Sequence, residues 1–267
     1  MPDTLAPARR DKLAYHLLVW GPAAVLLACA VAVALTDTNA SFFIALNHAA
    51  GTLPEVFWSS ATALGTGACA FALVAPTLRA APRLLAAALI TGVFGGLYTH
   101  ALKPLVDSAR PAGVLAAEQI HIIGEKLTSH SFPSGHSVTA FALAATIVFF
   151  CRQRARAAAL LLPLAALVAF SRIAVGAHWP LDVLAGSAGG WLCGAAGEAL
   201  SRRWLVWQKP SAQMAMAVAL IVMGATLAGT DLGYPQADPL KWLLAGVACF
   251  GGLLALHAKW LAREHAQ

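Results

Sequence analysis

Eight long apolar runs divide the chain and constrain its fold more than any other feature of the sequence. A helix crosses the bilayer core with roughly 20 apolar residues, and most of the runs approach that length. Hydrophobic residues make up 59% of the chain and charged residues only 11%, whereas soluble domains carry about 25% charged residues. A water-soluble fold could not bury so much apolar surface. We therefore predict an all-α polytopic membrane helical bundle, with spans at roughly residues 15–35, 55–76, 84–103, 137–151, 157–175, 183–200, 212–229 and 240–260.

The lysines and arginines of the connections predict the orientation of these spans. When the connections are assigned alternately to the two sides, thirteen of the 18 cations fall on one side. The positive-inside rule places that side, and with it both termini, in the cytoplasm, as expected for a bacterial inner membrane. The thirteen are Arg9, Arg10, Lys12, Arg79, Arg83, Arg152, Arg154, Arg156, Arg202, Arg203, Lys209, Lys259 and Arg263. The periplasmic or extracellular side holds Lys103, Arg110, Lys126, Arg172 and Lys241, which require a functional explanation.

The longest connection without a span runs from about residue 104 to residue 135 on the outer side. A loop of that length in a compact protein usually has a function or a structure of its own. Ala116, Ile120, Ile123 and Leu127 recur within it at helical spacing. This spacing fits a short amphipathic helix in the membrane interface and a plain connecting loop equally well.

This loop opens with the first segment whose residues could bind a ligand or take part in catalysis. Its sequence is Lys103-Pro-Leu-Val-Asp-Ser-Ala-Arg110-Pro111. If the third span continued through it, two helical turns would place Lys103 and Arg110 on one face, about 10 Å apart, although Pro104 disturbs such a helix. Asp107 is the only acid between them. The two cations therefore predict a cradle for a multiply charged anion.

The second segment, Ser131-Phe-Pro133-Ser134-Gly135-His136-Ser137, precedes the fourth span. Ser134 suits an N-cap position, and Gly135 lets the backbone approach a ligand closely. The free N–H groups at a helix N-terminus form a ready phosphate site. His136 would lie in the first turn, where it could donate a proton.

The third segment, Ser171-Arg172-Ile-Ala-Val-Gly-Ala-His178-Trp-Pro-Leu-Asp182, precedes the sixth span. Pro180 fits the first turn, and Asp182 then falls near N3, where the helix dipole favours its ionised form. His178 lies just before this helix, where Asp182 could orient it. Singly, such residues are usually interfacial or structural, but three such segments on one side indicate one catalytic site with a carboxylate-held base.

Together the segments resemble the three-part signature of the type 2 phosphatidic acid phosphatase (PAP2) superfamily, which also includes vanadium haloperoxidases. The order and internal spacing match at every signature position, in Lys103-x6-Arg110-Pro111, Pro133-Ser134-Gly135-His136 and Ser171-Arg172-x5-His178-x3-Asp182. The resemblance covers roughly residues 40–200. It implies a six-span core, which we place at residues 1–210, followed by two additional transmembrane helices in residues 211–267.

The resemblance also implies a role for each signature residue. His178 would be the nucleophile that takes the phosphoryl group as phosphohistidine, and Asp182 its orienting partner. His136 would protonate the leaving oxygen and later activate water. The phosphoryl oxygens would be held by Lys103, Arg110, Ser134, Gly135 and Arg172. We expect no metal or other cofactor, because three cations supply the positive charge and the sequence has no carboxylate cluster or spaced His/Cys set.

The implied activity is hydrolysis of a phosphate or pyrophosphate monoester of a membrane lipid. Candidate substrates of this class are undecaprenyl diphosphate, phosphatidylglycerol phosphate and phosphatidic acid. Alternatively, the same phosphohistidine could pass its phosphate to a second lipid such as lipid A. A haloperoxidase or a transporter is less favoured, because the apolar spans point to a lipid substrate and no charged residue lies deep in a span. The net charge of +6 is spread over short loops, which predicts no nucleic-acid partner.

Overall fold

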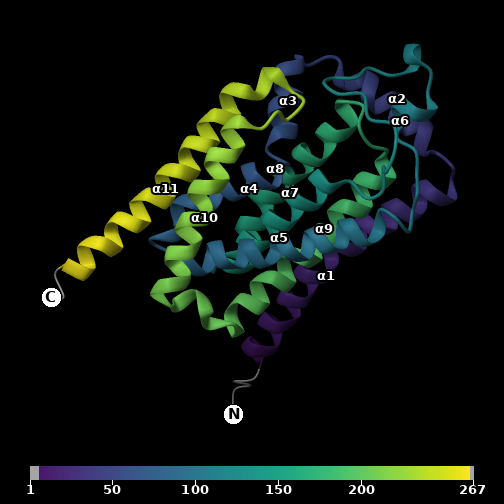
Figure 1. The fold of residues 1–267 in the computed structure, drawn as a ribbon. Helices are drawn as coiled ribbons and strands as arrows, with labels where there is room; N and C mark the ends of the chain where they lie inside the picture. The colour runs from purple at the N-terminus through teal and green to yellow at the C-terminus, as the bar shows by residue number, and fades with distance from the viewer. Residues whose placement is uncertain (1–5, 265–267) are drawn as a thin grey trace.

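The computed structural model describes residues 6–264 and the side chains of residues 12–258. Both chain ends lie outside this part, as do the side chains of Arg9, Arg10, Lys259 and Arg263 from the predicted cytoplasmic set. The described residues form helices and connections, with no β-strand among them (Figure 1). The predicted all-α membrane bundle is therefore confirmed.

The described part of the chain, residues 6–264, folds into eleven α-helices and four short 3-10 helices. They are α1 (Ala6–Leu35), α2 (Asn39–Ala50), α3 (Glu55–Ala63), α4 (Gly67–Val74), η1 (Ala75–Leu78), α5 (Pro82–Leu102), α6 (Pro111–Val114), η2 (Ala117–Gln119), α7 (Gly135–Phe150), α8 (Arg154–Ala174), α9 (Pro180–Arg203), η3 (Leu205–Gln208), α10 (Pro210–Gly229), η4 (Pro235–Ala237) and α11 (Asp238–Glu264).

Each of the eight predicted runs coincides with a helix or a helix pair. By length and apolar composition alone, not all of these helices qualify as membrane spans. Within the described residues, five helices meet both criteria, or six if the bent α3–α4 pair counts as one span. The five are Lys12–Leu35, Pro82–Leu102, Arg154–Ala174, Pro210–Gly229 and Pro235–Ala258. The apolar helix α7 has only 16 residues, and α9 is long but less apolar.

Helix α9 is less apolar because it lies inside the bundle, against α1, α5, α7 and α8 (Figure 1). Its neighbours approach so closely that only a small residue fits. A Cβ atom at Gly190 would lie 2.3 Å from the carbonyl oxygen of Val138, and one at Gly194 would lie 2.3 Å from that of Ala142. Glycine at helix contacts is typical of membrane bundles, and it lowers hydropathy without indicating exposure to water.

The predicted span at residues 55–76 is broken, because α3 and α4 meet at an angle of 73°. Gly65 lies at the break and touches the start of α7. A Cβ atom there would come within 2.9 Å of both the Cβ and the Cδ2 of His136. The missing side chain at Gly65 therefore makes room for His136. A side chain at this position would obstruct the histidine.

The connection between α5 and α7 does not contain the amphipathic helix considered for residues 116–127. It has only the short α6 and η2, and Ile120 adopts an extended backbone conformation. Two of the apolar side chains considered for that helix are buried within the protein: Ile120 is 8% exposed and Ile123 is 3% exposed. Asn47 of α2 accepts from the backbone N–H of His121 at 2.8 Å and donates to its carbonyl oxygen at 2.9 Å. The loop is thus held on the bundle.

Helices α10 and α11 pack against each other along one side of the molecule and contact α4 and η1 (Figure 1). The connection between them carries η4 and returns to α3. This brings residues 230–237 to the same end of the molecule as the loop from α5 to α7.

Candidate active site

The first turn of α9 fixes His178 and Asp182 relative to each other. Pro180 is the first helical residue, and Asp182 at N3 accepts from the backbone N–H of Trp179 at 2.9 Å. The same carboxylate oxygen accepts a hydrogen bond from the hydroxyl of Ser131. It also lies 3.4 Å from Nδ1 of His178. The predicted helix start is confirmed, and the predicted contact between the carboxylate and the imidazole is present.

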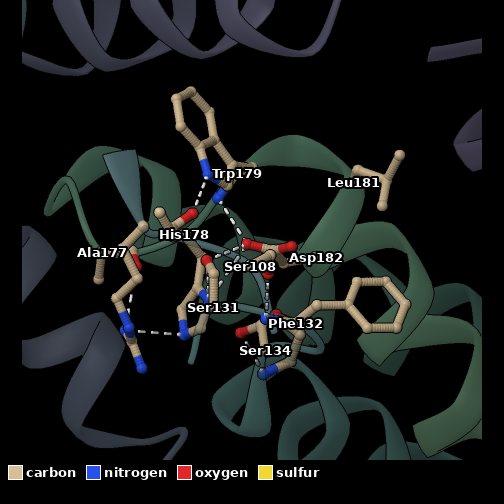
Figure 2. A network of polar contacts seen from close by, with 12 residues as sticks. Ser108, Ser131, Phe132, Ser134, Ala177, His178, Trp179, Leu181 and Asp182 are labelled. Carbon is tan, nitrogen blue, oxygen red and sulfur yellow. Dashed lines mark hydrogen bonds and ion pairs between the residues drawn. The ribbon is translucent and has the colours of Figure 1, made fainter. Parts of the chain in front are cut away.

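Figure 2 shows His178 beside Ser131 and Asp182. The other ring nitrogen of His178 faces Arg110, whose Nη1 lies 3.2 Å from Nε2 of the histidine and also donates to the carbonyl oxygen of Ala177 at 3.0 Å. A guanidinium only donates hydrogen bonds, so Nε2 must offer its lone pair and the ring proton must reside on Nδ1, towards Asp182. This tautomer is the one that a nucleophilic Nε2 requires.

Arg110 reaches this position from an extended segment, so the helix considered for residues 103–110 is wrong. Helix α5 ends at Leu102, two residues before Pro104, whose ring disfavours helical continuation. The backbone N–H of Arg110 instead donates to Thr128 at 2.9 Å, and its Nε donates to the carbonyl oxygen of Ser129 at 2.8 Å. The cradle therefore depends on the tertiary packing of the loop and not on helical periodicity.

Arg172, in the last turn of α8, is 2% exposed. Its Nη1 donates to the hydroxyl of Thr62 at 2.5 Å and to that of Tyr234 at 2.9 Å. Its Nε is buried without a hydrogen-bond acceptor in the protein. An unsatisfied buried donor costs about 1–3 kcal/mol or more, so the geometry suits an acceptor supplied by a ligand.

The three signature cations lie close enough to influence one another. Burial lowers the pKa of Lys103, and the charges of Arg110 and Arg172 lower it further. Burial and Arg172 likewise lower the pKa of Arg110. Among the side chains of residues 12–258, none of the three has a carboxylate partner within 4.0 Å. An uncompensated, partly buried positive charge of this kind favours binding of an anion.

This positive field acts directly on His178, which is 2% exposed. Burial lowers the pKa of its imidazole well below the ordinary value of 6.5, and Arg172, Arg110 and Lys103 add to the shift. The ring is therefore uncharged at neutral pH. An uncharged imidazole beside an anion-binding cluster is suited to attack an electrophile that the cluster holds.

The start of α7 closes the site from a further direction. Ser134 is its N-cap, as predicted, and its side chain accepts from the backbone N–H of Ser137 at 3.4 Å. The backbone N–H of Ser134 donates to the carbonyl oxygen of Asp182 at 3.1 Å, which joins the starts of α7 and α9. Gly135 opens the helix, and His136 lies within electrostatic range of His178 and all three cations. The structure thus brings the eight predicted site residues together.

An apolar cavity of about 300 Å³ adjoins the start of α7. It lies between α4, α5 and α7, and most of the residues that line it are small or apolar. Gly135 is part of this wall, so the cavity begins beside the predicted phosphate site. Its other lining residues include Phe71, Gly92, Gly96, Thr99 and Val138.

Three residues that contact the site were not assigned a role from sequence. Ser131 was quoted in its segment without one, although a serine beside a helix cap is a common hydrogen-bond donor. Thr62 and Tyr234 lie far from the signature in sequence and reach Arg172 only through folding. Within the described residues, no group of three or more His, Cys, Asp or Glu side chains could hold a metal ion.

Comparison with known proteins agrees with this fold. Residues 80–208 match the family model of the PAP2 superfamily. The putative undecaprenyl-diphosphatase YbjG of Escherichia coli (strain K12) is 42% identical over 78 residues, which cover 29% of this chain and 35% of the relative. The lipid A 1-phosphatase of Rhizobium etli is 39% identical over 111 residues, covering 38% of this chain and 44% of the relative. The alignments thus span less than half the length of these relatives.

The crystal structure of Aquifex aeolicus LpxE resembles the chain with a TM-score of 0.53 and 27% sequence identity, covering 62% of this chain and 95% of that chain. The fold and the gathered residues define an all-α membrane protein with a buried histidine beside a group of cations. Residues 80–208 belong to the PAP2 superfamily, and they contain all eight predicted site residues.

Proposed function

We propose that this chain is an integral-membrane lipid phosphatase that transfers a phosphoryl group first to His178 and then to water. The observation that carries the proposal is the position of Nε2 of His178, which lies 3.2 Å from Nη1 of Arg110 in a group of cations without carboxylate partners among the described side chains. Phosphoryl transfer depends mainly on positioning and on stabilisation of charge. This site offers both.

In the first step, the lone pair of Nε2 attacks phosphorus while the bond from phosphorus to the leaving oxygen breaks. His136, which must begin this step as the imidazolium beside the bound anion, gives its proton to that oxygen and becomes neutral. Arg110 releases Nε2 and, with Lys103 and Arg172, binds the phosphoryl oxygens, helped by the N-terminus of α7 at Ser134 and Gly135. The phosphorylated ring keeps its proton on Nδ1 and becomes cationic, and Asp182 stabilises that charge from 3.4 Å.

In the second step, His136 accepts a proton from water, whose oxygen attacks phosphorus. The bond between phosphorus and Nε2 breaks, and its electron pair returns to the ring. Inorganic phosphate then leaves, and Arg110 regains its hydrogen bond to Nε2. No metal ion is required in this scheme, since three cations hold the charge that develops on the phosphoryl oxygens.

The apolar cavity beside Gly135 supports a lipid as the substrate. Its position between α4, α5 and α7 allows a hydrocarbon chain to lie next to the phosphate site. Relatives named as an undecaprenyl-diphosphatase and a lipid A 1-phosphatase act on lipids with phosphate groups, as their names state. We take undecaprenyl diphosphate as the first substrate to test, and phosphatidylglycerol phosphate and phosphatidic acid as the next.

The distribution of cations supports a site on the periplasmic or extracellular face of a bacterial inner membrane, with both termini in the cytoplasm. Lys103, Arg110 and Arg172 belong to the cation-poor side and surround the site. In this arrangement residues 1–210 form the catalytic core, and residues 211–267 add two spans. Headgroups in the outer leaflet would reach the phosphate site directly.

Phosphate release by purified protein in detergent and EDTA tests this function. We expect the unaltered protein and His48→Asn to release phosphate from undecaprenyl diphosphate, and His178→Asn to release none. His48 is a matched control because it lies outside the site and bonds to the carbonyl oxygen of Gln119. Equal release by His178→Asn would exclude His178 as the nucleophile. Transfer that requires added lipid A would identify a phosphotransferase instead.

A further inference from the structure

The connection between α10 and α11 contacts a residue of the candidate site, although it lies outside the residues matched to the family. Its Tyr234 is 8% exposed, and its hydroxyl accepts from Nη1 of Arg172 at 2.9 Å. We propose that Tyr234 is a positioning residue, which holds the guanidinium of Arg172 in the orientation that binds a phosphoryl group. This inference rests on the proposed function of the site.

The first argument concerns the acceptors around Arg172. Its Nη1 is held by two neutral hydroxyl groups, one from Thr62 and one from Tyr234. A carboxylate in either place would orient the guanidinium but would also neutralise it. Neutral acceptors fix the side chain while its positive charge stays available, and Nε remains free of protein acceptors. The arrangement therefore orients the guanidinium, and no carboxylate neutralises its charge.

The second argument is the packing of the Tyr234 ring. It belongs to a buried cluster with Ile123, Val175 and Ala177, which lie in the loops on either side of the site. Gly124 allows this approach, since a Cβ atom there would lie 2.4 Å from the carbonyl oxygen of Gly233 and 2.7 Å from the ring. The hydroxyl is thus placed by a rigid, buried ring, not by a mobile surface side chain.

The third argument is that the connection itself is internally braced. The backbone N–H of Gly233 donates to the side chain of Asp231 at 2.8 Å. Lys241, which is 5% exposed, donates to the carbonyl oxygen of Thr230 at 3.0 Å and pairs with Asp238 at 2.7 Å. These contacts give this outer-side cation a structural role. They also fix the connection that carries Tyr234 to the ends of α10 and α11.

Binding of inorganic phosphate to the full chain in detergent, measured by calorimetry at constant ionic strength, tests the inference without turnover. We expect Tyr234→Phe to weaken binding by roughly tenfold, the effect of losing one hydrogen bond to a charged group. Tyr98→Phe is the matched control. It removes a hydroxyl that donates to the carbonyl oxygen of Ala185 at 3.1 Å, away from Arg172.

A double-mutant cycle separates positioning from a general loss of structure. In an Arg172→Lys background, Tyr234→Phe should weaken phosphate binding by less than twofold, because the guanidinium that it positions is absent. Thr62→Ala removes the other neutral acceptor and should reproduce the effect if Tyr234→Phe does not fold. Undiminished phosphate binding by Tyr234→Phe, an equal loss in both backgrounds, or no phosphate binding by the unaltered protein would overturn the inference.

Turnover of lipid by the same proteins distinguishes this inference from the proposed function. If unaltered protein and Tyr98→Phe hydrolyse lipid phosphate and Tyr234→Phe does so equally well with equal phosphate affinity, the inference fails and the function stands. If unaltered protein binds phosphate through Arg172 and Tyr234 but hydrolyses no lipid, the positioning role stands and the proposed function fails.

Discussion

Arg110 donates through Nη1 to Nε2 of His178 at 3.2 Å. This contact determines the tautomer, since an arginine cannot accept a hydrogen bond from the ring. It also places a cation beside an imidazole that burial already disfavours as an ion. A single contact therefore directs the lone pair of His178 towards Arg110 and disfavours its protonation.

We predict that His178 is uncharged at pH 6.5, with its proton on Nδ1. Burial and the cations lower its pKa, so near pH 6.5 the folded protein binds fewer protons than the unfolded chain. The stability from this group is accordingly present above pH 6.5 and is lost as the pH falls towards the lowered pKa. Nitrogen-15 NMR of labelled histidine, assigned with His178→Asn, measures both tautomer and pKa.

The control for this prediction is a pair of cation substitutions. Arg110→Met should raise the pKa of His178 towards its ordinary value, whereas Lys126→Met, at an exposed loop position, should leave it unchanged. A proton on Nε2, or a pKa of 6.5 in the unaltered protein, would contradict the account.

Asp182→Asn should lower kcat by roughly 10²-fold or more, because an amide does not stabilise the imidazolium of the phosphohistidine as a carboxylate does. The amide oxygen can still accept from Ser131 and from the backbone of Trp179, so the fold should persist. Asp37→Asn is the matched control, since Asp37 is exposed and its φ of 52° suits asparagine. Unchanged kcat in Asp182→Asn would remove the carboxylate from the mechanism.

Gly96→Leu should raise KM for a long-chain lipid several-fold and leave turnover of a short-chain phosphate ester unchanged. Gly96 lines the apolar cavity, and a Cβ atom there meets nothing within 4 Å, so the new side chain would fill the cavity without a backbone clash. Leucine also favours a helix over glycine by roughly 0.5–1 kcal/mol, so stability should not fall. Steady-state kinetics with two chain lengths measure the effect.

Gly246→Leu provides the comparison for the cavity prediction. Gly246 is an exposed helical glycine of α11 with nothing within 4 Å of its Cβ position, and it lies outside the cavity. Its substitution should change neither KM. If Gly96→Leu raised KM equally for the long-chain and the short-chain substrate, the cavity would not hold the lipid chain.

The cation distribution predicts that Lys126 faces the periplasm and Arg156 the cytoplasm. Fluorescent-protein and alkaline-phosphatase reporters, each fused after truncation at these two positions, measure the orientation. The alkaline phosphatase should be active after residue 126, and the fluorescent protein should fluoresce after residue 156. The reverse pattern would place the active site in the cytoplasm.

The helix starts of the site were predictable because their signals are local. Ser134 caps α7, and Pro180 with Asp182 opens α9, as neighbouring residues alone indicate. The route of Arg110 was not predictable, since its position depends on carbonyl groups of Thr128 and Ser129 in a folded loop.

Contacts between distant segments account for the other differences from the sequence analysis. The break between α3 and α4 lies where Gly65 meets His136 of α7. The hydroxyl groups of Thr62 and Tyr234 reach Arg172 from two other parts of the chain. No periodicity or motif records such contacts, because each depends on how separate elements pack.

The central claim is that His178 carries the phosphoryl group, and trapping of the phosphorylated enzyme tests it most directly. A phosphorus-32 aryl phosphate with a good leaving group needs no proton from His136, so His136→Asn should accumulate the intermediate. After an alkaline quench, which preserves phosphohistidine, peptide mapping should place the label on residue 178 in the unaltered protein and at higher occupancy in His136→Asn. His178→Asn should carry no label. Label on any other residue, or turnover without label in His136→Asn, would contradict the account.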